Sequence, residues 1–198
     1  MTKKKFFGGC AIVVVLCIGV TLVVATVSVY LENKEIKGSF GETIAEMCHP
    51  PAGGQASKDN LPEAGAAPLK TVVFPNGLPQ YHAWHTELPD DLRASGKDDV
   101  QIVVCIEELE PKIVEKCEYR ETDKEDTLFT IARQQPVSEA VVLNAQTGKR
   151  IAELRLRGGM PNECPENYTA LEDTTQYFNG KAVEYNDFLT AIEPLLRQ

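Results

Sequence analysis

The sequence predicts an α+β protein, in which a single N-terminal transmembrane helix precedes an antiparallel β-sheet domain with a C-terminal helix packed on it. Three observations predict this arrangement. A long uncharged hydrophobic run, residues 6–31, lies near the N-terminus. Strand-like segments dominate from residue 69 onward, and an amphipathic helical pattern closes the chain. Four cysteines follow the hydrophobic run, and an even number of exported cysteines is typical of a disulfide-stapled domain.

The hydrophobic run from Phe6 to Leu31 contains no charged residue. A helix rises about 1.5 Å per residue, so roughly 20 apolar residues cross a hydrocarbon core about 30 Å thick. Lysines occupy positions 3–5, whereas the residues just after the run carry mixed charges. Because cytoplasmic flanks are enriched in basic residues, we expect residues 1–5 to form a cytoplasmic tail and everything after Leu31 to lie outside. The run is therefore predicted to be a single-pass signal-anchor.

A cleaved signal peptide is the alternative interpretation of the same run. The apolar region of a signal peptide is usually about 7–15 residues long, and this run is longer. A cut after Ala25 would match the small-residue preference only loosely. The alternative product would be secreted, so both interpretations place the folded domain outside the cytoplasm.

The charge of the chain excludes one class of partner. It has 20 basic and 29 acidic residues. Three lysines precede the hydrophobic run and every acid follows it, so the part after the run has 17 basic and 29 acidic residues and a net charge of −12. Nucleic-acid binding needs clustered Lys and Arg, so we expect no nucleic-acid partner. The expected partners are the membrane, through residues 6–31, and a protein or another component of the cell envelope.

The exported cysteines are Cys48, Cys105, Cys117 and Cys164. Four cysteines allow three connectivities. Residues 110–112 contain a proline between two strand-like segments, and a three-residue loop there would place Cys105 opposite Cys117. We therefore expect the pairs Cys105–Cys117 and Cys48–Cys164. Zinc is the rival use of four thiols, but the chain has no CxxC pair.

The chain divides into successive parts beyond the hydrophobic run. Residues 32–48 are juxtamembrane, and the capping-box pattern from Ser39 to Glu42 predicts a short helix over residues 40–47. Residues 49–68 are rich in Pro, Gly and Ala and are interpreted as a linker. Residues 69–198 form the extracytoplasmic domain, long enough for one core.

Strand patterns recur through this domain, and one hairpin is specified by its register. Gly148 can adopt the positive φ of a short hairpin loop, and counting outward places Val142 opposite Ala152. Glu139 then faces Arg155, an opposite-charge pair. The predicted strands are Lys70–Phe74, Val100–Glu107, Ile113–Arg120, Thr127–Gln134, Val137–Asn144 and Arg150–Arg157.

The remainder of the domain is predicted to be a loop and a helix. Residues 158–180 contain paired glycines and two prolines around Cys164, which favours a loop pinned by that cysteine. The last residues carry an apolar stripe at helical spacing, with Asn186 or Asp187 as a candidate N-cap. Pro194 is expected to bend or end this helix near Glu193.

His82 and His85 are the candidate metal ligands, since few histidines are present. The surrounding segment lies between Pro79 and Pro89 and is expected to be extended or looped, where positions i and i+3 point to opposite faces. No Glu stands in the position of an HExxH motif, and Trp84 between the histidines is interpreted as a core anchor. We therefore predict no metal site, no cofactor and no catalytic residues.

No other reactive set is indicated. No serine lies in a GxSxG turn, and no Gly-containing calcium loop accompanies the acids around residues 107–110 and 121–126. The predicted function is a non-catalytic binding or structural module, anchored in the membrane at the cell envelope. The alternatives are an exported hydrolase or metal-dependent enzyme using His82 or His85 with nearby carboxylates, and an accessory subunit of a membrane complex.

Overall fold

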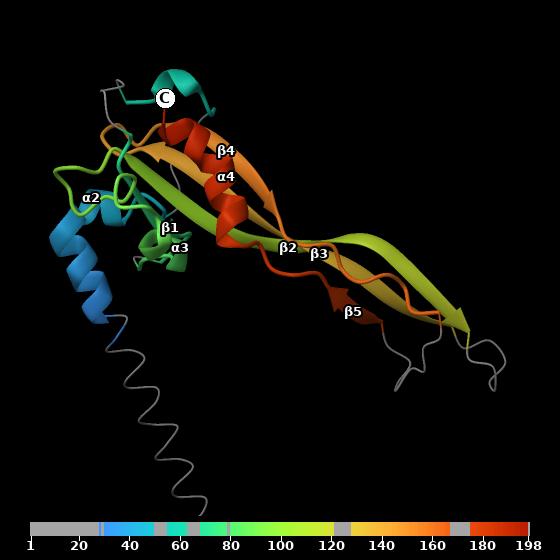
Figure 1. The fold of residues 1–198 in the computed structure, drawn as a ribbon. Helices are drawn as coiled ribbons and strands as arrows, with labels where there is room; N and C mark the ends of the chain where they lie inside the picture. Colours follow the sequence, from blue (N-terminus) through green and yellow to red (C-terminus); the bar gives the residue numbers. More distant parts are fainter. Residues whose placement is uncertain are drawn as a thin grey trace, which may run out of the picture.

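The computed structural model describes residues 28, 30–49, 55–62, 68–78, 80–120, 128–166 and 175–197 (Figure 1). Most of the predicted anchor, residues 6–31, lies outside this part of the chain. Among the described residues, no helix combines the length and hydropathy needed to cross a bilayer. The elements are a helix over residues 30–40, α2 Glu42–Ala45, η1 Lys58–Asn60, β1 Thr71–Pro75, α3 Ala83–Glu87, β2 Ile102–Arg120, β3 Leu128–Asn144, β4 Arg150–Arg157, β5 Gln176–Asn179 and α4 Tyr185–Leu196.

The fold is α+β as predicted, but the sheet is mixed and not purely antiparallel. Its strand order is β1-β2-β3-β4, and β2, β3 and β4 pair antiparallel. The edge strand β1 runs parallel to β2. Strand β5, which falls in the predicted loop 158–180, pairs parallel to β3 beyond the end of β4. Both parallel pairs join segments that are distant in sequence, so no local turn signal marks them.

Strands β2 and β3 are far longer than predicted, with 19 and 17 residues. At about 3.3 Å per residue, β2 spans roughly 60 Å. The sequence predicted breaks around Pro111 and Pro136, yet both strands continue through them. The register of the pair shifts between Leu109 and Lys112, close to Pro136 on the facing strand. Proline lacks a backbone N–H and is accommodated at such a bulge, so it marks an irregularity in the ladder and not a hairpin loop.

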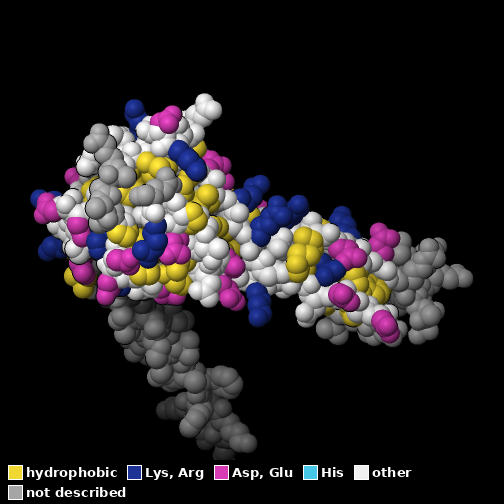
Figure 2. Space-filling view, turned by 45° about the horizontal axis from the view of Figure 1, so that its top comes forward, with side chains coloured by type: hydrophobic (Ala, Val, Ile, Leu, Met, Phe, Trp, Pro, Cys, Tyr) yellow, Lys and Arg dark blue, Asp and Glu magenta, His cyan; other side chains and the backbone are white. Residues whose placement is uncertain are grey.

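These long strands divide the molecule into two parts. We call residues 107–120 of β2, residues 128–136 of β3 and β5 the arm, and the remaining described part the head. The arm projects from the head as a narrow ribbon (Figure 1). In the space-filling view, Lys and Arg side chains gather where the arm leaves the head (Figure 2).

The first hydrophobic core lies between one face of the sheet and α4. Alternate residues of the strands point to this face because side chains alternate along a strand. Phe188, Ile192 and Leu196 of α4 are fully buried against it, which confirms the predicted packing of the C-terminal helix. Each such side chain contributes roughly 1.5–3 kcal/mol by leaving water. The sheet residues in this core include Ile102, Val104, Ile106, Ala140, Val142 and Leu156.

The second core lies on the opposite face and is covered by the helix of residues 30–40 and by α2. Ile36 and Phe40 are buried among the intervening strand residues, including Val103, Val141 and Leu143. The Phe40 ring meets those of Phe74 and Tyr81 edge-on, with centroids 6.3 and 6.2 Å apart. Residues 32–48, which were predicted to be juxtamembrane, therefore contribute to a core with the sheet, and the head has three layers.

The middle of the predicted linker also contacts the sheet. The N–H of Ser57 donates to the carbonyl of Arg150 at 3.2 Å, and the Asn60 amide donates to the same oxygen at 2.8 Å. The Asn144 amide donates to the carbonyl of Asn60 at 2.9 Å. Residues 55–62 are thus held against the β3–β4 hairpin.

The β3–β4 hairpin has the predicted register over Val137–Val142, but the register shifts by one residue next to the loop, where Leu143 pairs with Arg150. Val142 pairs with Ala152 and Glu139 pairs with Arg155. Gly148 has a φ of 67°, as its place in the loop requires. A local turn and two alternating strands agree on which side faces the core, and this consistency made the register predictable.

The helix boundaries differ from the predictions in three places. Ser39 belongs to the helix of residues 30–40, and α2 begins after Gly41, whose φ of 80° separates the two helices. The segment expected to be extended between Pro79 and Pro89 contains α3, with His82 as its N-cap. The N-cap of α4 is Glu184, and Asp187 completes its capping box from the N3 position.

Pro194 was predicted to bend or end the last helix near Glu193, and the structure shows that it does not end α4 there. The helix continues through Pro194 to Leu196, and Leu195 and Leu196 are both buried. The free energy gained by burying Leu195 and Leu196 offsets the cost of the backbone hydrogen bond that proline cannot make.

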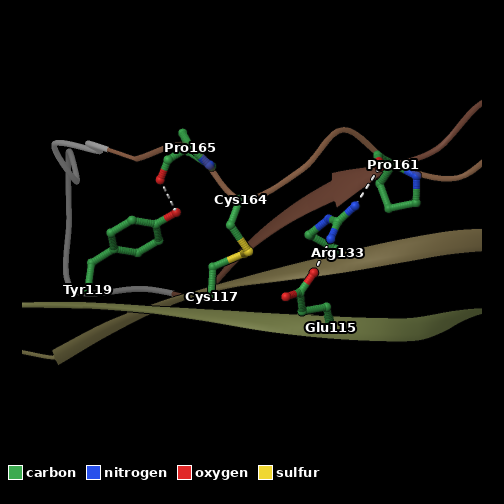
Figure 3. Close-up of a disulfide and its surroundings, with 7 residues drawn as sticks. All are labelled: Glu115, Cys117, Tyr119, Arg133, Pro161, Cys164 and Pro165. Atoms are coloured by element: carbon green, nitrogen blue, oxygen red, sulfur yellow. Dashed lines mark hydrogen bonds and ion pairs between the residues drawn. A yellow bond between two sulfur atoms is a disulfide. The ribbon is translucent and has the colours of Figure 1, made fainter.

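The four cysteines that were predicted to be exported form two disulfides, but with a different pairing from the one predicted. The bonds are Cys48–Cys105 and Cys117–Cys164. Because β2 continues through residues 110–112, Cys105 and Cys117 lie on one strand, roughly 40 Å apart at about 3.3 Å per residue. The first bond ties the end of the N-terminal helical segment to the sheet, and the second ties the 158–166 segment to the arm (Figure 3).

Polar contacts surround the arm disulfide (Figure 3). Tyr119 donates its hydroxyl to the carbonyl of Pro165 at 2.7 Å. Arg133, which is 9 % exposed, forms an ion pair with Glu115 and donates to the carbonyl of Pro161. The segment of residues 158–166 is therefore bound to both long strands of the arm, through Tyr119 of β2 and Arg133 of β3.

Replacing Gly180 by alanine should destabilise the region where arm and head meet. The N–H of Gly180 donates to the carbonyl of Gln134 at 2.8 Å, and a Cβ on Gly180 would overlap the carbonyl oxygen of Gly159. We expect Gly180→Ala to lower the free energy of unfolding by about 1–3 kcal/mol, measured by urea denaturation. Gly38→Ala is the control: a Cβ there has no neighbour within 4 Å, and its helical position should give a gain of about 0.5–1 kcal/mol. Equal effects of the two substitutions would contradict the close approach.

Candidate functional site at the base of the arm

A pocket of about 290 Å³ lies where the arm leaves the head, on the face of the sheet that carries α4. We call it the junction pocket. Strands β2 and β3, the start of α3 and the segment before α4 all contribute to its wall. Its lining residues are His82, Trp84, Ile106, Glu108, Leu109, Pro111, Pro136, Val137, Ser138, Ala182 and Val183.

The apolar part of the pocket is held in place by core packing. The Trp84 ring stacks on Phe188 of α4, with centroids 4.9 Å apart and planes 22° from parallel. Phe188 is fully buried, so the indole is positioned by the first core. Trp84 thus packs against the first core, as the sequence indicated, and it also lines the pocket.

His82 contributes a polar group of defined protonation. Its Nδ1 accepts a hydrogen bond from the backbone N–H of Trp84 at 3.3 Å, which is the N-cap contact of α3. The neutral ring therefore carries its proton on Nε2. Burial lowers the pKa of His82, and the carboxylate of Glu108 opposes this shift only in part. His82 is consequently a neutral hydrogen-bond donor at neutral pH.

Glu108 and Ser138 add two further polar groups from facing strands. The register of β2 and β3 places them directly opposite each other. Ser138 is 7 % exposed, whereas Glu108 is exposed at the rim. The pocket thus combines a buried hydroxyl, an exposed carboxylate and a neutral imidazole with apolar walls. Such a mixture suits the binding of a small apolar group with a few directed polar contacts.

Backbone contacts close the side of the pocket near α4. The N–H of Gly158 donates to the carbonyl of Pro136, and the N–H of Gly159 donates to that of Lys181, each at 2.9 Å. These bonds hold the segment that supplies Ala182 and Val183 to the pocket wall. The pocket is therefore preformed by contacts between distant segments.

His85 lies outside the pocket, although it is close to His82 in sequence. Its ring stacks on Tyr81, with centroids 4.6 Å apart and planes 9° from parallel. His85 is 6 % exposed, and its Nδ1 has no hydrogen-bond partner among the described residues. The two histidines that were only candidates for metal binding thus pack against different neighbours. The described part of the chain contains no group of three His, Cys, Asp or Glu residues suited to a metal ion.

Protonation of His85 should make folding sensitive to mild acid. Burial, reinforced by the positive charge of Arg93, lowers the pKa of His85 to about 4 from the ordinary 6.5. Between these values the unfolded chain binds a proton that the folded chain does not, so stability falls as pH decreases from 6.5 towards 4. From pH 7 to pH 5 this single group should cost about 2 kcal/mol. The measurement is urea denaturation at both pH values, compared with His85→Phe; an equal loss in the variant would contradict the assignment.

Ser138 and His82 both line the junction pocket, but among the described residues no hydrogen bond joins them. The sequence drew attention to His82 and Trp84 but not to Glu108 or Ser138. Those two residues are 30 positions apart and meet only through the long-range register of β2 and β3. Only a correct prediction of the β2–β3 register could have shown that Glu108 and Ser138 lie opposite each other.

Comparisons with known proteins add no further assignment. Family models, curated proteins and solved structures were all compared with the chain, and none matches it. The functional interpretation consequently rests on the residues and geometry of this chain: a disulfide-braced α+β domain with a projecting arm and a preformed pocket at its base.

Proposed function

We propose that this protein is a single-pass membrane protein whose outer domain is a non-catalytic module that binds a partner protein. The uncharged run from Phe6 to Leu31 supports the anchor, and the lysines before it support a cytoplasmic N-terminus. The two disulfides are typical of an oxidising, extracytoplasmic environment. The helix of residues 30–40 would continue outward from the anchor, and its packing in the second core would fix the head close to the membrane.

The observation that carries the binding role is the preformed pocket at the base of a braced arm. Trp84, Ile106 and Val183 would receive an apolar side chain of the partner, and the Nε2–H of His82 would donate to an acceptor beside it. A rigid, preformed site avoids the entropy cost of ordering loops on binding. The rest of the arm would extend the contact surface beyond the pocket.

The test is co-purification of the full-length protein from native membranes with variants of the pocket. Ser138→Phe should fill the pocket, and Glu108→Lys should reverse the charge at its rim without touching the core. Glu118→Lys is the matched control, since Glu118 is also exposed on β2 but lies far along the arm. A partner recovered with the wild type and with Glu118→Lys, but reduced at least tenfold with both pocket variants, is the expected result. Recovery of the same partner with both pocket variants would exclude the pocket as its binding site.

A further inference from the structure

A second hollow, of about 300 Å³, lies at the base of the arm and is lined by Leu109, Glu110, Lys112, Val137, Arg155 and Arg157. We call it the basic hollow. Leu109, Val137 and Arg157 are direct neighbours across β2, β3 and β4. Strand alternation places Val137 on the same face as Val141 and Leu143, which is the face of the second core. The basic hollow therefore lies on the face opposite α4, beyond the part of the sheet that the N-terminal helices cover.

Two basic residues of the basic hollow, Lys112 and Arg157, differ from most of the described arginines because they do not form ion pairs with described carboxylates. Arg93, Arg133, Arg150 and Arg197 each form an ion pair with a carboxylate. Arg157 and Lys112 have no ion pair or hydrogen bond recorded among the described side chains, and both are exposed. Arg155 faces Glu139 across the strands. Arg155 is therefore matched by Glu139, close to which Glu107 and Glu153 also lie, whereas no described carboxylate forms an ion pair with Arg157 or Lys112.

A neighbouring hollow adds one more lysine, but its two basic residues are balanced by two acids. Arg157 also lines a shallow hollow with Lys181, which is exposed before α4. The acids near Lys181 are Glu184 and Asp187, and these hydrogen-bond each other's backbone in the capping box of α4. Among the residues that the structure describes, Glu110 is the only carboxylate in the lining of the basic hollow itself.

We propose that the basic hollow binds an acidic peptide segment of a partner protein, on the opposite face of the sheet from the junction pocket, with which it shares the lining residues Leu109 and Val137. Arg155 and Arg157 are two residues apart on β4, so they are roughly 7 Å apart along one face. Guanidinium groups pair with carboxylates in a bidentate manner, which suits acidic side chains at a similar spacing on an extended segment. Leu109 and Val137 supply an apolar floor for a hydrocarbon side chain between them.

The position of the basic hollow argues against anionic lipid as its ligand, given the proposed anchor. Strand β4 lies on the opposite side of the head from the end of the 30–40 helix that would meet the membrane (Figure 1). A sulfated glycan would match the charges but would gain little from the apolar floor. An acidic peptide with interspersed apolar residues matches both the charges and the floor.

The experiment measures binding of a fluorescent peptide of alternating glutamate and leucine to the detergent-solubilised full-length protein. Arg157→Glu combined with Lys112→Glu should weaken binding at least tenfold. Lys149→Glu, which reverses one positive charge in the exposed β3–β4 loop, should change it less than twofold. Affinity should also fall as salt is raised, because exposed charges are screened.

Heparin and phosphatidylserine vesicles serve as the competing probes. Binding of either probe in preference to the peptide, with the same dependence on Arg157, would overturn the peptide assignment. Equal peptide binding by the wild type and the double variant, or no binding at all, would overturn the site. Ser138→Phe, which fills the junction pocket, should leave peptide binding unchanged. A failure of the proposed peptide site can therefore be told apart from a failure of the proposed partner site in the junction pocket.

Discussion

Replacing Phe40 by alanine should lower the free energy of unfolding by about 3–5 kcal/mol, the range for removing a fully buried aromatic side chain. Phe40 is 2 % exposed and contacts the rings of Phe74 and Tyr81 from the helix that precedes α2. The truncation would leave a cavity in the second core, where the N-terminal helix meets the sheet. Urea denaturation of the detergent-solubilised full-length protein, followed by circular dichroism, measures the effect.

Leu31→Ala is the matched control for Phe40→Ala. Leu31 lies in the same helix but is 57 % exposed, so its truncation should change stability by less than about 0.5 kcal/mol. If Phe40→Ala were equally mild, the helix of residues 30–40 would not be part of the folded domain.

Removing the Cys48–Cys105 bond should have an effect of similar size. Its sequence separation is 57 residues, and closure of a loop this long stabilises by roughly 4 kcal/mol on the chain-entropy argument. Both cysteines are also buried in the second core. We expect Cys48→Ala with Cys105→Ala to lower stability by about this amount and to raise hydrogen exchange in the head.

The Cys117–Cys164 bond offers the complementary variant. Its removal should raise hydrogen exchange in the arm, around residues 113–120, while the head remains protected. Mass spectrometry of the non-reduced digest checks the pairing itself. A peptide linking Cys105 to Cys117 would contradict the structure and restore the pairing that the sequence suggested.

The error in that pairing has one origin. Pro111 was interpreted as part of a hairpin loop, because proline between two strand-like segments is a common turn signal. In the structure it lies where the β2–β3 register shifts, and the strand continues past it. Local sequence cannot distinguish a proline in a turn from a proline at a bulge, since the difference depends on the strand that pairs alongside.

Features specified by local pattern were predictable. The β3–β4 register follows from Gly148 and from alternation on both sides of it, and α4 follows from its apolar stripe. Strand β5 was missed because its four residues pair only with β3, some 45 residues earlier in the chain. The candidate site also depends on long-range strand pairing. His82 could be singled out because the chain has few histidines, whereas Glu108 and Ser138 meet only through the pairing of β2 with β3.

The most direct test of the whole account is the location and redox state of the full-length protein in intact cells. We expect it to stay in the membrane fraction after an alkaline carbonate wash, with its domain open to an external protease and four of its six cysteines protected from alkylation. Recovery from the soluble cytosol with every thiol reactive would contradict the anchor, the oxidising compartment and the proposed role together.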